Sequence, residues 1–203
     1  DGARLVMVDH LGRIADGDQL LYVIASDRKR AGTLQGPVVG TVMSNLGLEQ
    51  KLQAEGVEFL RAKVGDRYVL AMLKEHGGVL GGETSGHLLC LDRTTTGDGL
   101  ISALEVLAVM KRTGRPLAEL VAGMPKLPQV MINVRVKQRI DLSKSQAIQD
   151  AVKRVEEGLG TTGRVVLRAS GTEPVIRVMI EAQEEAVASR YANELAEVVR
   201  TAI

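Results

Sequence analysis

Short apolar runs alternate with helical patterns along the first part of the chain. Residues 5–8 predict a buried strand, and residues 38–43 and 57–60 predict two more. Between and after these runs, apolar side chains recur at helical spacing: after Asp16, after a cap at Ser44 or Asn45, and across residues 67–75. Alternating strands and helices are typical of an α/β layer.

A glycine-rich turn is predicted at residues 77–86, with an apolar strand after it at residues 88–91. Asp98 then predicts the cap of a long helix, whose end is marked by two basic residues and Gly114. Its inward face is predicted to carry Ile101, Leu104, Leu107 and Ala108. Prolines at 125 and 128 break any helix, so we place a linker at residues 123–128, between domains at 1–122 and 129–203.

Beyond the linker, the pattern changes to that of a smaller domain. Residues 130–136 alternate apolar with mostly polar positions, which predicts a half-buried strand. Ser143 and Gln146 have capping-box spacing before a helical apolar stripe that ends at Leu159. Two strands at residues 165–167 and 175–180 and a final helix complete the order β-α-β-β-α. We therefore expect an α/β mixed-sheet domain followed by a small α+β domain with an antiparallel sheet.

Composition excludes several classes of function. The 203 residues include 26 Lys+Arg and 25 Asp+Glu, so a net charge of +1 gives no bias toward nucleic acid or an anionic membrane. One Phe, three Tyr and no Trp argue against base-stacking platforms. The single cysteine, Cys90, forbids an internal disulfide and fits a reducing compartment. We expect a cytoplasmic protein without nucleic-acid or membrane partners; the first residue, Asp1, is not Met, which suggests a fragment.

Residues 168–177 carry the chemistry of a phosphate cradle. Ser170 and Thr172 offer hydroxyl donors, and Gly171 lets backbone amides approach a ligand closely. Arg168 and Arg177 supply planar cationic groups that match an anion. Many hairpin turns need the same residues, so a glycine turn with surface arginines is an equally good interpretation.

A second polar loop spans residues 81–87. Glu83 and Ser85 can hydrogen-bond neighbouring hydroxyls of a polyol such as a sugar, and His87 can bind a phosphate or transfer a proton. A lone histidine more often has a structural role. A third loop brings Lys63 to a strand end, where it would act as an acid or base if burial or neighbouring cations lowered its pKa. The alternative there is a solvated charge cluster with Asp66 as a helix cap.

These loops occur in the order of a known family. Supporting segments are residues 8–10 with 16–20, 40–45, 63–67, 82–87 (Gly-Glu-Thr-Ser-Gly-His), 94–99 (Thr-Thr-Thr-Gly-Asp-Gly), 170–174 (Ser-Gly-Thr-Glu-Pro) and 176–179. Over essentially its whole length, the chain resembles the C-terminal part of the α-D-phosphohexomutase superfamily, most closely its bacterial glucosamine-phosphate branch. Members have four domains around a central cleft.

The resemblance implies a role for each loop. Residues 1–122 correspond to the third domain, preceded by the tail of a metal loop, and residues 129–203 to the fourth. Sugar hydroxyls would be bound by Glu83 and Ser85, with His87 in the same loop. The fourth-domain loop would hold the phosphate that is not transferred; its residues are Arg168, Ser170, Gly171, Thr172 and Arg177. Arg4 matches an arginine near the phosphoserine, and Lys63 is our candidate for proton transfer or charge stabilisation.

The resemblance is incomplete at the metal loop. The family pattern Asp-Gly-Asp-Gly-Asp-Arg binds Mg²⁺ through three aspartates; Asp1 matches the second, Ala3 stands at the third, and the first is absent. The segment with the phosphoserine is also missing.

The implied reaction of the intact enzyme is conversion of glucosamine 6-phosphate to glucosamine 1-phosphate. A phosphoserine and a bisphosphate intermediate carry the phosphoryl group, and the missing N-terminal domains are the expected protein partners. The chain alone should be inactive. Two alternatives stay open, a stand-alone phosphosugar-binding or regulatory module and a mutase for glucose or mannose phosphates, and so does a homodimer.

Overall fold

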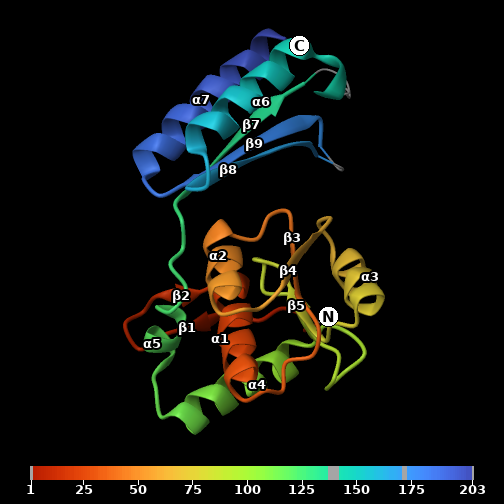
Figure 1. Cartoon of the computed structure of the whole chain (residues 1–203), viewed down its shortest axis with the longest axis vertical. Helices are drawn as coiled ribbons and strands as arrows, with labels where there is room; N and C mark the ends of the chain where they lie inside the picture. The colour runs from red at the N-terminus through yellow and green to blue at the C-terminus, as the bar shows by residue number, and fades with distance from the viewer. Residues whose placement is uncertain (1, 137–141, 171–172, 203) are drawn as a thin grey trace. The chain divides into compact units, whose positions relative to one another are not determined.

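The chain forms two compact units, Asp1–Lys126 and Leu127–Ile203. The computed structural model describes residues 2–136, 142–170 and 173–202 (Figure 1). Over these residues, each buried apolar cluster draws its members from one unit, two clusters in the first and one in the second. Each unit therefore has a hydrophobic core of its own.

The first unit contains a mixed four-stranded sheet, as predicted. Its strand order is β4 (Phe59–Ala62), β3 (Val38–Thr41), β5 (Leu80–Gly82) and β6 (Leu88–Cys90). β3 pairs in parallel with β4 and β5, while β6 runs antiparallel to β5. All four residues of β3 are buried, which is expected for a strand whose sheet is covered on both faces.

Helices pack on both faces of this sheet (Figure 1). α1 (Gly17–Arg30), α2 (Leu46–Ala54), α4 (Gly99–Thr113) and α5 (Leu117–Val121) contribute to the larger core, which also contains Val38. α3 (Asp66–His76) contributes Val69 and Leu73 to a smaller cluster with Val39. Successive strand residues point to opposite faces, so Val38 and Val39 lie in different cores.

Side chains define where the helices begin. Asp16 caps α1, as predicted, and it also forms a capping box with Gln19. Asn45, and not Ser44, caps α2 by accepting a hydrogen bond from the Gly47 amide. The interpretation of Asp66 as a cap is wrong, because Gly65 is the cap residue of α3 and makes no side-chain cap bond.

The expectation of a buried strand at residues 5–8 is wrong. A two-residue strand, β1 (Met7–Val8), pairs with β2 (Ile14–Ala15) in a separate antiparallel ribbon. Val6 and Val8 are 63% and 60% exposed, while Leu5 and Met7 pack against the core. Only one face of the ribbon packs against the core. Because residues 5–8 are all apolar, the sequence does not show which of them lie on that face.

The glycine-rich turn at residues 77–86 contains a strand that the sequence did not predict. β5 lies between β3 and β6, and its three residues are buried. A Cβ atom added to Gly81 would lie 2.7 Å from the Val39 carbonyl oxygen and 2.8 Å from a Val69 methyl carbon. Glycine is therefore required here by close packing rather than by a turn.

The predicted inward face of the long helix is also wrong. α4 begins and ends as predicted, with Asp98 and Gly114 at its caps. Leu104 and Leu107, however, are 64% and 46% exposed, and the helix buries Ser102, Val106 and Val109 instead. The helix has apolar residues on most sides, so periodicity alone does not identify the buried one.

The second unit is an antiparallel three-stranded sheet with two helices on one face, as predicted (Figure 1). β9 (Val175–Ala182) lies between β7 (Gln129–Arg135) and β8 (Gly163–Ala169). α6 (Gln146–Leu159) and α7 (Glu185–Thr201) pack on the sheet, and a short 3₁₀ helix, η1 (Leu142–Lys144), precedes α6. The predicted capping box at Ser143 and Gln146 is wrong, because α6 begins after Ser145.

Candidate functional site

The loop at residues 82–87 joins β5 to β6 and is held against the start of α1. The Thr84 carbonyl oxygen accepts a hydrogen bond from the Gly17 amide at 3.0 Å. The Thr84 hydroxyl donates to a carboxylate oxygen of Asp18 at 2.8 Å. Both the backbone and the side chain of one loop residue are therefore fixed by consecutive residues of a helix.

Asp18 is a completely buried carboxylate in the first turn of α1. The same oxygen that binds Thr84 accepts a hydrogen bond from the Asn45 amide at 2.8 Å. Burial raises the pKa of Asp18 to about 6, although hydrogen bonds from Asn45, Thr84 and Ser44 act to lower it. Taking the carboxylate out of water thus outweighs the bonds that favour its charged form.

Glu83 connects this loop to the loop that carries Lys63. A carboxylate oxygen of Glu83 accepts a hydrogen bond from the Gly65 amide at 2.9 Å. Gly65 has a φ of 125°, a conformation that side chains rarely adopt, so the turn depends on glycine. Ser85 is exposed at the tip of its loop. Two of the three predicted polar loops are therefore physically joined through Glu83.

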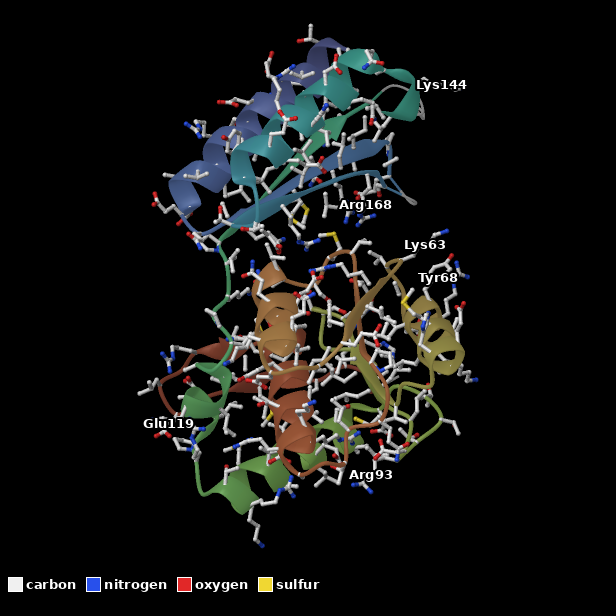
Figure 2. All side chains as sticks on the ribbon, viewed as in Figure 1. Lys63, Tyr68, Arg93, Glu119, Lys144 and Arg168 are labelled. Carbon is white, nitrogen blue, oxygen red and sulfur yellow. The ribbon has the colours of Figure 1, made fainter. Side chains whose placement is uncertain are left out.

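Two cations lie near the Tyr68 ring. Lys63 is one of them (Figure 2), and Arg67 is the other. The Lys63 ammonium lies 6.0 Å from the centre of the Tyr68 ring, and the Arg67 guanidinium carbon lies 4.6 Å from it. Arg67 also donates a hydrogen bond to the Tyr68 hydroxyl at 2.8 Å. Lys63 is exposed, so the burial that would favour an acid or base role is not present.

His87 ends the loop in a packed environment. Its Nε2 atom lies 3.8 Å from a carboxylate oxygen of Asp66, and this buried nitrogen makes no hydrogen bond within the described residues. A Cβ atom on Gly97 would lie 2.0 Å from Nε2, so the loop at residues 94–99 closes over the imidazole. Asp98 in that loop is a helix cap, as the simpler interpretation held.

The N-terminal segment lies against the same loops. Arg4 forms an isolated antiparallel bridge with His87, and the Leu5 amide donates to the Gly86 carbonyl at 2.9 Å. The Gly99 amide donates to the Gly2 carbonyl at 2.9 Å. The first unit therefore brings together Arg4, Glu83, His87 and the loop of Lys63, with Arg4 exposed to solvent.

In the second unit, the predicted phosphate cradle has two arginines directly opposite each other. Arg168 on β8 and Arg177 on β9 are paired residues in the sheet register. Their neighbours Leu167 and Val178 pack in the core, so both arginines point to the face away from the helices. Burial, and the charge of Arg177, lower the pKa of Arg168.

Ser170 completes the described part of this cradle. Its side chain is almost fully buried, and its hydroxyl accepts a hydrogen bond from the Glu173 amide at 3.3 Å. Glu173 in turn accepts from Arg177 at 3.1 Å. The buried Nε atoms of Arg168 and Arg177 have no hydrogen-bond partner within the described residues. Gly171 and Thr172 lie outside the described residues.

Metal ligands were expected at the start of the chain. Asp1 lies outside the described residues, and the methyl group of Ala3 offers no ligand atom. No group of three or more His, Cys, Asp or Glu side chains able to hold a metal ion occurs among the residues that were described. The described residues by themselves therefore do not fit a magnesium site. Separately, within the same described ranges, no helix is long and apolar enough to cross a membrane.

Comparison with protein families gives two consecutive matches. The model described as phosphoglucomutase/phosphomannomutase, alpha/beta/alpha domain III, matches residues 16–127. The model for the C-terminal domain of the same family matches residues 131–198. This chain belongs to the phosphoglucomutase/phosphomannomutase family. The family matches agree with the resemblance found in the order of the loops.

Individual relatives share more than half of the residues of this chain. It is 56% identical over 202 residues to the phosphoglucosamine mutase of Alkalilimnicola ehrlichii, and 55% identical over 202 residues to that of Methylococcus capsulatus. In both comparisons the match spans 100% of this chain and 45% of the relative. The chain thus spans less than half the length of these relatives.

Solved structures of the phosphohexomutases share the fold. Aspergillus fumigatus N-acetylphosphoglucosamine mutase, in complex with GlcNAc-6P and magnesium, aligns with a TM-score of 0.82 and 22% identity, covering 98% of this chain and 50% of that one. A family protein from Burkholderia thailandensis aligns with a TM-score of 0.79 and 24% identity, covering 100% and 45%. These likenesses show that the two-unit chain has a phosphohexomutase fold.

The sequence alone assigned no role to Asp18 or to Gly17. Both lie in the segment Asp-Gly-Asp-Gln-Leu at residues 16–20, which carried part of the family resemblance. A Cβ atom on Gly17 would lie 2.0 Å from the Glu83 carbonyl oxygen, so the helix start and the loop are in close contact. The Asp-Gly-Asp pattern at residues 16–18 was the available signal, but the sequence did not show that Asp18 binds Thr84.

Proposed function

We propose that this chain provides the sugar-recognition and phosphate-binding domains of a phosphoglucosamine mutase, which interconverts glucosamine 6-phosphate and glucosamine 1-phosphate. The observation that carries the proposal is the direct pairing of Arg168 and Arg177 beside Ser170. Two guanidinium groups opposite each other repel, and a bound phosphate would offset this repulsion while accepting hydrogen bonds. The similarity to two phosphoglucosamine mutases along the whole chain supports the amino sugar.

Each unit would have a separate task in this reaction. In the first, Glu83 and Ser85 would bind sugar hydroxyls, and His87 would bind phosphate or transfer a proton. Lys63 and Arg4 would stabilise the charge of the transferring phosphoryl group. Glu83 already accepts one backbone hydrogen bond, which fixes its direction and leaves acceptor capacity on the carboxylate.

The second unit would hold the phosphate that is not transferred. In the proposed cycle, a phosphoserine passes its phosphoryl group to the sugar, the resulting bisphosphate turns over, and the other phosphate returns to the serine. One cradle must then accept a phosphate from either end of the sugar. Two arginines and a hydroxyl suit this requirement, because they bind the phosphate and do not read the shape of the sugar.

The donor serine and most metal ligands are expected outside this chain, on N-terminal domains that act as its partners. Magnesium would be held there, and of this chain's residues Asp1 is the proposed ligand. The described residues form no cation site, so no step of the reaction is assigned to a metal here. We accordingly propose that the chain alone is inactive. A cytoplasmic location and a homodimer remain sequence-based expectations.

The proposal is tested by comparing the chain with a fusion protein. The fusion places the N-terminal part of the Alkalilimnicola ehrlichii relative before this chain and carries Ala3→Asp. Glucosamine 6-phosphate, glucose 6-phosphate and mannose 6-phosphate are assayed separately. We expect no turnover by the chain alone and preferential turnover of glucosamine 6-phosphate by the fusion.

Three outcomes would contradict the proposal. Turnover by the chain alone would show that the donor is not missing. Preference for glucose or mannose phosphate would keep the family and exclude the amino-sugar assignment. A folded fusion that binds phosphosugars without converting any of them would favour a binding module. Circular dichroism and gel filtration of the fusion establish that it is folded.

A further inference from the structure

Asp18 connects two segments that are far apart in the sequence. One carboxylate oxygen accepts hydrogen bonds from the Thr84 hydroxyl and the Asn45 amide, each at 2.8 Å. The next residue back, Gly17, donates its amide to the Thr84 carbonyl at 3.0 Å. The start of α1 therefore fixes both the peptide group and the side chain of Thr84.

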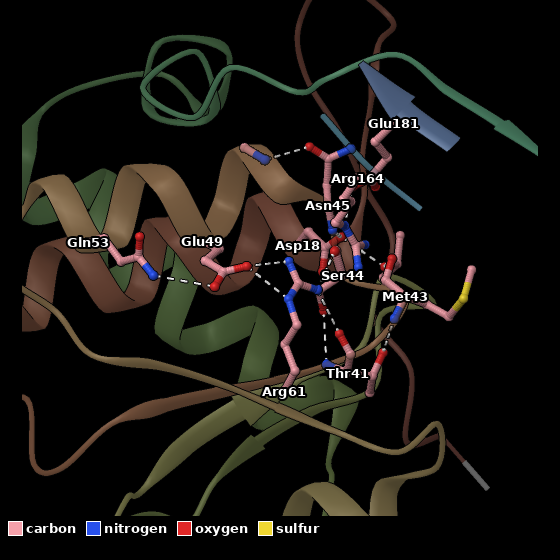
Figure 3. A network of polar contacts seen from close by, with 12 residues as sticks. Asp18, Thr41, Met43, Ser44, Asn45, Glu49, Gln53, Arg61, Arg164 and Glu181 are labelled. Atoms are coloured by element: carbon pink, nitrogen blue, oxygen red, sulfur yellow. Dashed lines mark hydrogen bonds and ion pairs between the residues drawn. The ribbon is translucent and has the colours of Figure 1, made fainter. Parts of the chain in front are cut away.

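The other end of this connection is a rigid corner after β3 (Figure 3). The Ser44 hydroxyl accepts from the Thr41 amide at 3.1 Å, and Asn45 caps α2. Arg61 donates to the carbonyl oxygens of Thr41 and Ser44 at 2.9 and 2.7 Å, and it is paired with Glu49. Asp18 thus ties a loop to a corner that is clamped from a neighbouring strand.

Burying the charged carboxylate of Asp18 costs free energy. Asp18 has none of its surface exposed, and no Lys or Arg among the described residues forms an ion pair with it. An uncompensated buried charge destabilises the fold, whereas a neutral side chain of the same shape avoids that cost. Hydrogen bonds to an ionised acceptor are shorter and stronger than those to a neutral one. An ionised Asp18 therefore holds the loop more firmly than a neutral side chain would.

Thr84 lies between the two candidate sugar-binding residues. Ser85 is exposed, and Glu83 accepts from the Gly65 amide, so neither of them attaches the loop to α1 through its side chain. A rotation of residue 84 would displace both neighbours, because the three residues share consecutive peptide groups. The orientation of the loop therefore depends on the contacts made by Thr84.

We propose that Asp18 is the positioning residue of this loop: through Thr84 it keeps Glu83 and Ser85 oriented toward the hydroxyl groups of a phosphosugar. The role given to Glu83 and Ser85 rests on the proposed function, whereas the link between Asp18 and the loop does not. Asp18 itself touches no substrate in this scheme. Its effect should appear in sugar recognition and not in the binding of phosphate to Arg168 and Arg177 of the second unit.

The first test measures the loop directly, by amide hydrogen exchange in the full 203-residue chain. The Glu83 and Gly86 amides donate within the loop, at 3.0 Å to His87 and 2.9 Å to Glu83. Asp18→Asn and Thr84→Val should speed their exchange by about tenfold, the scale of one charge-assisted hydrogen bond. Thr84→Ser keeps the hydroxyl and should restore slow exchange.

Asp27→Asn is the matched control. Asp27 is a nearly buried aspartate on the same helix, but it pairs with Arg112 and Arg30 rather than with the loop. In the Asp27→Asn variant, the amides of Glu83 and Gly86 should exchange at the same rates as in the unchanged chain. Unchanged exchange in both Asp18→Asn and Thr84→Val, or equal acceleration in Asp27→Asn, would overturn the proposal. If Asp18→Asn fails to fold, the exchange rates of Thr84→Val alone test the proposal.

The second test compares two ligands by NMR titration of the same chain. Asp18→Asn should weaken binding of glucosamine 6-phosphate by about tenfold and leave the affinity for inorganic phosphate unchanged. A purely structural defect would weaken both ligands or neither, and either result would contradict the positioning role. If the unchanged chain binds no glucosamine 6-phosphate, the proposed function loses support, and the exchange measurements still decide the role of Asp18.

Discussion

At the scale of single residues, buried charged side chains differ in how fully other side chains of the chain pair with them. Arg28 is 6% exposed and pairs with Asp92 and Glu105, which joins α1 to the segments around α4. Its charge is satisfied inside the first unit. Arg168 and Arg177 face each other instead, and the Nε atom of each has no hydrogen-bond partner within the described residues. Glu173 pairs with Arg177 alone and is exposed, so the like charges of the two arginines are only partly offset, which favours a functional role for the pair.

We predict that Arg177→Ala weakens phosphosugar binding by about 1.5–3 kcal/mol, the scale of hydrogen bonds to charged groups. Isothermal titration calorimetry of the fusion protein with glucosamine 6-phosphate measures the change. Arg154→Ala is the control, because Arg154 is an exposed arginine on α6, which covers the other face of the sheet. Equal affinity in Arg177→Ala and the unchanged protein would exclude the cradle.

A second prediction concerns how Asp18 couples stability to pH. Its pKa rises from 3.8 to about 6 on folding, so the folded state holds the proton more tightly than the unfolded state. The stabilisation from this group is complete below about pH 4 and is lost as pH rises to about 6. A shift of about two units corresponds to about 3 kcal/mol.

The measurement is urea unfolding at several pH values, followed by NMR signals of the first unit. Asp18→Asn lacks this titration, so its free energy of unfolding should gain about 3 kcal/mol relative to the unchanged chain between about pH 4 and about pH 6.5. Contributions from other carboxylates cancel in the difference. A difference that does not change with pH would mean that Asp18 is not desolvated as described.

The residues of the candidate site differ in how far sequence could identify them. Residue type alone singled out Arg168 and Arg177 and left a glycine turn with surface arginines equally open; their direct pairing comes from the register of β8 and β9. Asp18 was missed because an acidic residue in the first turn of a helix normally faces solvent and favours the helix dipole. Its burial depends on Thr84, which is 66 residues away in the sequence.

At the scale of elements, sequence patterns identified which segments are helices or strands better than they identified which side is buried. β7 alternates clearly, and its register with β9 buries Val134 as predicted. β5 was missed because two of its three residues are glycines, whose absence of side chains is required by packing against β3. Glycine has a low propensity for strands, so the sequence of β5 does not indicate a strand. Only its pairing with β3 and β6 in the assembled sheet reveals it.

The orientation of α4 gives a direct test of the corrected face. Leu104→Lys should change the free energy of unfolding of the first unit by less than about 0.5 kcal/mol, because Leu104 is 64% exposed. Val106→Ala should lower it by about 1–3 kcal/mol, because Val106 is fully buried. Urea unfolding of the two variants compares them. A larger loss for Leu104→Lys would restore the orientation suggested by periodicity.

At the scale of the whole molecule, each of the two units has its own core, and the function we propose gives each unit its own task. The first unit brings polar groups together in loops at the ends of β4, β5 and β6. The second presents cations on the open face of a sheet. Neither unit gathers carboxylates for a metal among the described residues. A complete mutase along the lines we propose therefore needs further domains, as the greater length of the relatives allows.

The residue at position 3 affects whether adding such domains would be enough for mutase activity. In the family pattern this position carries a carboxylate that binds a hard cation through oxygen, and a methyl group cannot replace it. We predict that the fusion protein with Ala3 turns over glucosamine 6-phosphate about ten- to a hundredfold more slowly than the fusion with Ala3→Asp, the usual cost of changes around a metal site. Ala3→Ser, a small polar replacement, is the matched control and should remain slow.

Steady-state assays of the three fusions across a range of magnesium concentrations measure this difference. If the loss reflects weaker metal binding alone, high magnesium should partly restore the rate of the Ala3 fusion, whereas a misplaced phosphoryl group would leave the rate low at every concentration. Equal rates for Ala3 and Ala3→Asp would show that position 3 is not a ligand. The segment would then belong to the third domain through its pairing with His87 and Gly86, and the metal would have to be held without it.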